Sequence, residues 1–159
     1  MTRLGALMGA GVALALAGAA PPLQAQAIRG YEIGLEGLAL LEDPAWLGGA
    51  MYGGWRPGGG ARLALTIGAG SSDGRLSGRG ELLAQFLLSP GRRSGVGFYG
   101  LGGVAGVAGP RDQGFLVVGL GLERAPGTGS GWAIEAGVGG GVRVAVGWRW
   151  RRLELPGGP

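Results

Sequence analysis

The sequence predicts an all-β protein, an eight-stranded antiparallel up-and-down transmembrane β-barrel, and three observations carry this prediction. Residues 142–150 alternate an apolar face, which ends in two tryptophans, with a face that carries arginine. Pro-Gly pairs recur at residues 57, 90, 126 and 156, about one hairpin apart. The apolar segments between turns mostly have the ~9–11 residues that a tilted membrane-spanning strand needs, whereas strands of soluble proteins centre on ~5–6 residues.

The first 27 residues are predicted to be a signal peptide. Arg3 precedes an apolar run over residues 4–20, two prolines end the run, and Ala25-Gln26-Ala27 offers a small-x-small cleavage site. A retained membrane anchor is the alternative. Cleavage near Ala27 leaves residues 28–155 as the expected β-barrel and residues 156–159 as a short C-terminal tail. Because the chain has no cysteine, a lipid-modified N-terminus and disulfides are both excluded.

The composition favours one ordered domain of 159 residues. Glycine supplies 40 residues, but hydrophobic residues make up 46% of the chain and charged residues only 15%, which argues against disorder. The net charge of +4 is mild and the arginines are scattered, so no nucleic-acid partner is predicted. After the signal peptide no apolar run reaches the ~18 residues of a membrane-spanning helix.

The turns divide the chain into eight expected strands, and a second break lies between successive Pro-Gly pairs. Residues 81–88 also have helical spacing, but they occupy the fourth place in a regular array and are assigned to a strand. The outward loops contain three aspartates, Asp43, Asp73 and Asp112. These aspartates either contact a divalent ion or a lipopolysaccharide headgroup, or serve only as turn-forming residues. The expected strands are 29–41, 47–56, 61–70, 79–89, 96–108, 115–124, 131–139 and 142–153.

Within the strands, side chains at alternate positions separate an apolar face from a charged one. Because an arginine at the bilayer midplane costs about 2–4 kcal/mol, the charged face is expected to point into the barrel. There the charges must be paired, and a structural network is favoured over a gated pore or proton path, because side chains just fill an eight-stranded barrel. The predicted interior network consists of Glu32, Glu36, Arg56, Arg62, Arg79, Glu81, Glu123, Glu135, Arg143, Arg149 and Arg151.

Five aromatic residues lie towards strand ends on the apolar face, where residues of a membrane–water interface are expected. Ordinary core aromatics are the alternative. The predicted membrane-interface residues are Tyr31, Trp55, Trp132, Trp148 and Trp150.

The export signal, the eight alternating segments and the closing stretch VRVAVGWRWRR make residues 28–155 resemble the small eight-stranded outer-membrane β-barrels of the OmpA/OmpX-like class. The resemblance implies the bacterial outer membrane as location, contact with outer-membrane lipid and lipopolysaccharide, and insertion by the outer-membrane assembly machinery. That machinery recognises a final strand that usually ends in an aromatic residue. This chain departs from the pattern, because five residues separate Trp150 from the closing Pro-Gly-Gly-Pro.

The expected function is a structural or small-solute, porin-like role. Enzymes of this architecture that act on lipid A use histidine with serine, and this chain has neither histidine nor cysteine. We therefore predict a non-enzyme with no catalytic residue, metal or cofactor. Two alternatives remain: a soluble periplasmic β-barrel that binds a hydrophobic ligand, and a pair of short membrane helices at residues 95–109 and 132–148, against which Glu135 and Arg143 count. The sequence indicates no oligomeric state.

Overall fold

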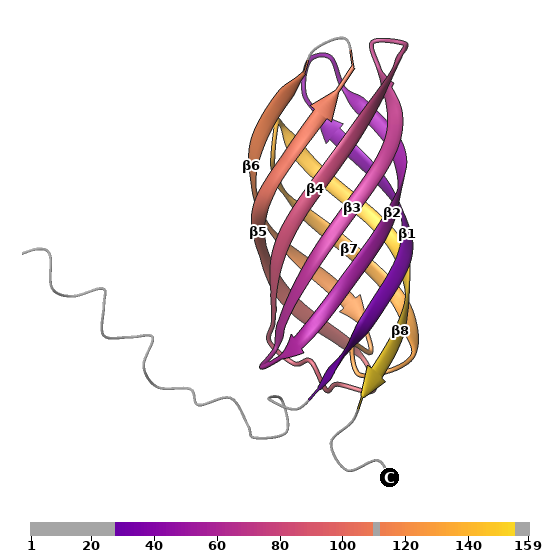
Figure 1. Cartoon of the computed structure of the whole chain (residues 1–159), viewed down its shortest axis with the longest axis vertical. Coiled ribbons are helices and arrows are strands. Elements are labelled where there is room, and N and C mark those ends of the chain that lie inside the picture. Colours follow the sequence, from indigo (N-terminus) through magenta and orange to yellow (C-terminus); the bar gives the residue numbers. More distant parts are fainter. Residues whose placement is uncertain (1–27, 110–111, 155–159) are drawn as a thin grey trace, which may run out of the picture.

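The computed structural model describes residues 28–109 and 112–154, so the predicted signal peptide and C-terminal tail lie outside the described residues. Each strand pairs antiparallel with its sequence neighbours, and the last strand pairs with the first to close a barrel (Figure 1). The predicted eight-stranded antiparallel up-and-down barrel is thereby confirmed. The strands are β1 (Arg29–Leu41), β2 (Trp46–Gly58), β3 (Ala61–Ser72), β4 (Arg75–Leu87), β5 (Val96–Ala108), β6 (Gln113–Arg124), β7 (Ser130–Val138) and β8 (Val142–Glu154).

The two ends of the barrel differ in what they hold. We call the end where β1 starts and β8 stops the terminal end; it lies at the bottom of Figure 1 and includes the connections after β2, β4 and β6. The opposite end, with the connections after β1, β3, β5 and β7, is the far end. No helix in the described residues is long and apolar enough to cross a membrane.

The strand register sets how far the strands are staggered around the barrel. Following paired residues once around the barrel from Tyr31 leads back to β1 at Leu41, a shear of ten residues. A stagger of this kind tilts the strands, and with eight strands it leaves an interior that side chains can fill. The path runs through Trp55, Leu63, Ala84, Gly102, Val118, Val138 and Val142.

The β3–β4 hairpin is longer than the sequence predicted. The expected break over residues 71–78 was wrong in length, because the strand pairing continues to Ser72 and Arg75 and leaves only two residues in the turn. Asp73 and Gly74 have φ values of 52° and 70°. Two residues with positive φ form the tight turn whose twist matches that of a hairpin, and Asp-Gly is a favoured pair for it.

The outer face of the barrel is apolar on every strand. Leu82 is exposed and Leu83 is buried, so residues 81–88 alternate as a strand and not as a helix. A soluble monomer rarely exposes a continuous apolar patch of more than a few hundred Å². Exposed side chains include Ile33, Leu35, Met51, Leu65, Ile67, Leu82, Val104, Leu116, Val118, Leu120, Ile134, Val138 and Val146.

Apolar side chains occupy part of the interior. Leu38, Leu40, Trp46 and Ala145 form a buried cluster towards the far end. A second cluster, which includes Tyr52, Leu83, Tyr99 and Leu101, lies against the walls formed by β2, β3, β4, β5 and β6.

Glycine makes room for two of the interior aromatic rings. A Cβ atom at Gly121 would overlap the ring of Tyr99, and a Cβ atom at Gly48 or Gly70 would overlap the indole of Trp46. The glycine content of the strands therefore serves the packing of the barrel interior at these positions.

Candidate functional site

The charged interior is the most distinctive feature of the barrel. The structure places all eleven of the predicted network residues inside it, each with an exposed fraction of 8% or less. They come from β1, β2, β3, β4, β6, β7 and β8, at positions where the alternation turns the side chain inward. Burial of this many charges is tolerable only where they are paired, and the ion pairs arrange them in two clusters.

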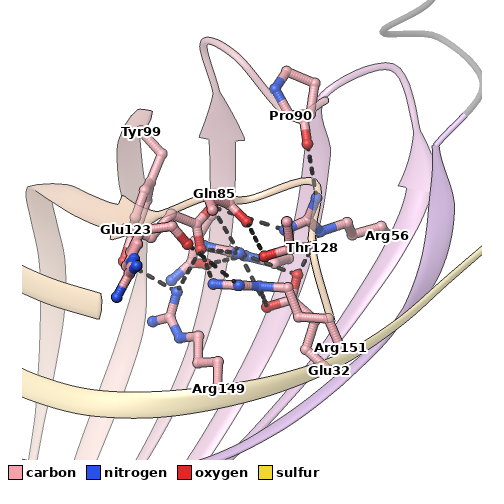
Figure 2. A network of polar contacts seen from close by, with 12 residues as sticks. Glu32, Arg56, Gln85, Pro90, Tyr99, Glu123, Thr128, Arg149 and Arg151 are labelled. Atoms are coloured by element: carbon pink, nitrogen blue, oxygen red, sulfur yellow. Dashed lines mark hydrogen bonds and ion pairs between the residues drawn. The ribbon is translucent and has the colours of Figure 1, made fainter. Parts of the chain in front are cut away.

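The larger group, which we call the terminal-end cluster, consists of Glu32, Arg56, Arg62, Glu123, Arg149 and Arg151. Arg62 lies at its centre, with Nη1 at 3.1 Å from Glu32 Oε2 and 3.0 Å from Glu123 Oε2. Figure 2 shows other members of the cluster, among them Glu32, Glu123 and Arg151. Arg56 also pairs with Glu32, and Arg151 Nη2 donates to Glu123 Oε2 at 2.9 Å. Four guanidinium groups thus surround two carboxylates, which leaves this cluster with an excess of positive charge.

The smaller group, the far cluster, consists of Glu81, Arg79 and Arg143. Arg143 donates through both Nε and Nη2 to the Glu81 carboxylate, with the shorter contact at 2.7 Å. Such two-pronged contacts between guanidinium and carboxylate are among the stronger hydrogen bonds in proteins. Arg79 Nε donates to Glu81 Oε1 at 2.8 Å, and its Nη2 donates to the carbonyl oxygen of Gly139 at 3.0 Å. The far cluster is therefore tied to the β7–β8 turn.

Glu135 joins the two clusters. One carboxylate oxygen lies 2.6 Å from Arg149 Nη2, and the other lies 2.9 Å from Arg143 Nη1. The Tyr99 hydroxyl donates to Glu135 at 2.7 Å, and the Gln85 amide donates to it at 3.0 Å. Because Glu135 faces both arginines, the interior charges form one connected network along the barrel.

Glu36 differs from the other buried carboxylates. Its side chain is 8% exposed, and it makes no ion pair within the described part of the chain. Its Oε1 atom has no hydrogen-bond partner there either. The sequence prediction of a fully paired network therefore does not hold at Glu36.

Sequence reasoning missed several polar and aromatic members of the interior. The Arg149 guanidinium lies 4.1 Å from the ring centroid of Tyr52, and that of Arg62 lies 4.8 Å from Tyr99. Gln85 accepts a hydrogen bond from Arg62 Nε at 2.5 Å. The alternation of β4 already put Gln85 on the charged face, whereas the glycine-rich strands β2 and β5 gave no periodic signal for the two tyrosines.

The five predicted interface aromatics lie on the outer face, and all belong to the terminal end. Tyr31 pairs with Trp55, and Trp132 pairs with Trp148, across neighbouring strands. Four are exposed, from Trp148 at 42% to Tyr31 at 64%, and Trp132 is half-buried.

Phe86 and Phe98 are exposed at the same end of β4 and β5 and extend this set. We call the seven residues the aromatic girdle. At the far end the exposed large side chains of the described residues are aliphatic and include Leu41, Leu47, Leu76 and Leu116.

A cavity of about 320 Å³ opens at the far end above Trp46. Two of the predicted loop aspartates, Asp43 and Asp73, line it, and Asp112 does not. The Trp46 indole forms part of its lining and donates a hydrogen bond from Nε1 to Ser77 Oγ at 2.7 Å. Within the described ranges no three acidic side chains are grouped so that they would hold a metal ion.

Comparison with known proteins adds evidence on the fold. No family model and no curated protein matches this chain. Among solved structures, the barrel is similar to the crystal structure of the N-terminal β-barrel domain of Pseudomonas aeruginosa OprF, with a TM-score of 0.59 and 16% sequence identity. The match covers 76% of this chain and 97% of that domain. The two proteins share a fold. At this level of identity the similarity concerns the architecture of the barrel.

Proposed function

We propose that this protein is a bacterial outer-membrane β-barrel with a structural role, and that its interior does not conduct ions. The observation that carries the proposal is the separation of the two faces. Leucine, isoleucine, valine and aromatic side chains are exposed around the outside, whereas the eleven network charges are buried inside. A barrel in water would gain nothing from that arrangement, whereas a barrel in lipid requires it.

The closed strand ladder supports the same proposal. In a bilayer each backbone polar group without a partner costs several kcal/mol, so only helices and closed barrels cross it. Here β1 pairs with both β2 and β8, which leaves no open sheet edge. Seven of the eight strands have 12 or 13 residues, enough for a tilted crossing of ~9–11 residues.

The packing of the interior favours a structural role over a small-solute pore. Arg56, Arg62, Arg143 and Arg149 are each 2% exposed or less, and Trp46 is 1% exposed beneath the far-end cavity. The ion pairs bind side chains from opposite walls of the barrel to one another. Movement of an ion through the barrel would have to separate several of these pairs at once.

The alternative of a soluble barrel with a hydrophobic ligand fits this interior poorly. Such a protein needs a mostly apolar cavity inside the barrel. The buried side chains here include Glu32, Arg62, Glu123 and Arg149 at the centre of the terminal half. We propose no catalytic function, since neither histidine nor cysteine occurs in the sequence.

The proposal is tested by fractionating cells and running the membrane fraction on a gel with and without boiling. We expect the protein in the outer membrane, with a mobility that changes on heating because the closed barrel resists detergent. N-terminal sequencing of the mature protein should then begin near Ile28. A protein found in the soluble periplasmic fraction would contradict the assignment of the apolar outer face to lipid. Planar bilayer recordings should show no single-channel steps, and regular steps would favour the small-solute pore.

A further inference from the structure

The exposed charges of the described residues differ in sign between the two ends of the barrel. Five arginines and one acid, Glu154, are exposed at the terminal end, whereas four acids and one arginine, Arg75, are exposed at the far end. We call the five terminal-end arginines the arginine collar; they are Arg29, Arg92, Arg93, Arg124 and Arg152. The four far-end acids are Glu42, Asp43, Asp73 and Asp112.

The arginine collar lies just beyond the aromatic girdle. Arg29 precedes Tyr31 by two residues on the outer face of β1, and Arg152 follows Trp150 by two residues on the outer face of β8. Arg152 is also the strand partner of Tyr31. Residues two apart in a strand point to the same side, about 7 Å from each other. A lipid whose tail contacts the girdle would thus have its headgroup level with the collar.

The collar guanidinium groups are free to bind an anion. All five side chains are exposed, and none makes an ion pair within the described ranges, where every ion pair lies in the barrel interior. The side-chain hydrogen bond found in the collar joins Arg92 Nη1 to the carbonyl oxygen of Val96 at 3.2 Å. Guanidinium groups bind phosphate through paired hydrogen bonds, so arginine is the residue of choice at phosphate-binding sites.

We propose that the arginine collar binds the phosphate groups of anionic glycerophospholipids, in the leaflet that surrounds the terminal end. This inference rests on the proposed function, because it requires a barrel inserted in a bilayer. The far end is unsuited to the same ligand, since its exposed acids would repel phosphate. The collar and the girdle together determine which end of the barrel contacts the anionic phospholipid and how deeply the barrel lies in the bilayer.

The tryptophans of the girdle can report the binding of a lipid through their fluorescence. Trp55, Trp132, Trp148 and Trp150 lie in the girdle next to the collar, so a brominated lipid bound there quenches their fluorescence. The mature protein is reconstituted in phosphatidylcholine vesicles that contain equal small fractions of either brominated phosphatidylglycerol or brominated phosphatidylcholine. We expect the relative affinity for phosphatidylglycerol to be about twofold or more above that for phosphatidylcholine, and to fall in 0.5 M salt.

Two collar variants are used, so that a folding defect in one of them does not decide the test. One changes the strand residues, Arg29→Gln with Arg152→Gln, and the other changes the loop residues, Arg92→Gln with Arg93→Gln. Each should lower the preference for phosphatidylglycerol, while the far-end control Arg75→Gln retains it. The heat-dependent mobility shift verifies that each variant still forms a closed barrel.

The outcomes separate this inference from the proposed function. Equal quenching by the two brominated lipids in the unaltered protein, or an unchanged preference in both collar variants, would overturn the collar as a phosphate site. Competition by lipid A that exceeds competition by unlabelled phosphatidylglycerol would also overturn the assignment to glycerophospholipid. Absence of quenching by either lipid would mean that the barrel is not inserted, and the proposed function itself would then fail.

Discussion

Glu135 and Arg149 form the contact through which the two interior charge clusters meet, with 2.6 Å between a carboxylate oxygen and a guanidinium nitrogen. The two residues lie on the paired strands β7 and β8, and both are 2% exposed. Arg149 also reaches Glu123 in the terminal-end cluster at 3.6 Å, whereas Glu135 reaches Arg143 in the far cluster. Loss of this contact would leave the two clusters joined through the hydrogen bonds of Gln85 and Tyr99.

Replacing Glu135 with glutamine should destabilise the barrel by about 3–5 kcal/mol, because Arg143 and Arg149 would each lose a buried partner. The matched control is Glu36→Gln, which removes a buried carboxylate that has no ion pair in the described structure and should change stability by less than about 1 kcal/mol. Urea unfolding in lipid vesicles, followed by the mobility shift, measures both. Equal losses in the two variants would contradict the role of Glu135 as the joint of the network.

If the outer face contacts lipid, the stability lost when an arginine is placed there should depend on the depth of the substituted residue in the bilayer. Ile67 lies near the middle of β3, and Ile67→Arg should cost about 2–4 kcal/mol at the bilayer midplane. Leu76, the second residue of β4 at the far end, should tolerate arginine at a cost of about 0–1 kcal/mol. Unfolding titrations in vesicles give both values. If the two variants unfold alike, the outer face is not in lipid.

Glycine at position 121 should resist substitution, because a Cβ atom there would overlap the ring of Tyr99. We expect Gly121→Ala to destabilise the barrel by about 1–3 kcal/mol through overpacking. Gly100→Ala is the control, since a Cβ atom at Gly100 meets no atom within 4 Å. Unfolding midpoints of the two variants should differ, and the Tyr99→Ala background should relieve the cost at position 121. A persistent cost in that background would point to another cause.

Salt should act differently on the two sets of arginines. The interior pairs are buried and weakly screened, so 0.5 M salt should leave the unfolding midpoint of the barrel nearly unchanged. The arginine collar is exposed, so the same salt should reduce the preference for anionic lipid. Measuring both quantities on one vesicle preparation compares them directly. A midpoint that falls steeply with salt would show that the interior pairs are open to solvent.

The alternation of residues along each strand allowed much of the barrel to be predicted. In β8, valine and tryptophan alternate with Arg143 and Arg149, and the cost of arginine in lipid decides which face is inside. The same argument failed for Tyr52 and Tyr99, because glycine interrupts the period of their strands. It also missed that Asp73-Gly74 alone makes the β3–β4 turn, although that pair is a strong hairpin signal.

Which arginine meets which carboxylate could not be predicted from the strands one by one. Arg62 on β3 touches Glu123 on β6 because the stagger brings both to the same height across the barrel. The stagger is the sum of eight pairing offsets, and no single strand pattern encodes it. The same holds for Glu36: its place in the strand pattern did not reveal that its Oε1 atom has no hydrogen-bond partner in the described part of the chain.

The pairing of Arg29 with Glu154 brings the first and last residues of the barrel together on neighbouring strands. A short linker could therefore join Glu154 to Arg29, and the chain could be opened at the two-residue turn of Asp73 and Gly74, with every strand still beside the same partners. In such a circular permutant the strands would be synthesised in a different order, but the hydrogen-bonded pairing between them would stay the same. In three dimensions the closed barrel has no first strand, because β1 and β8 are neighbours in the same way as every other pair.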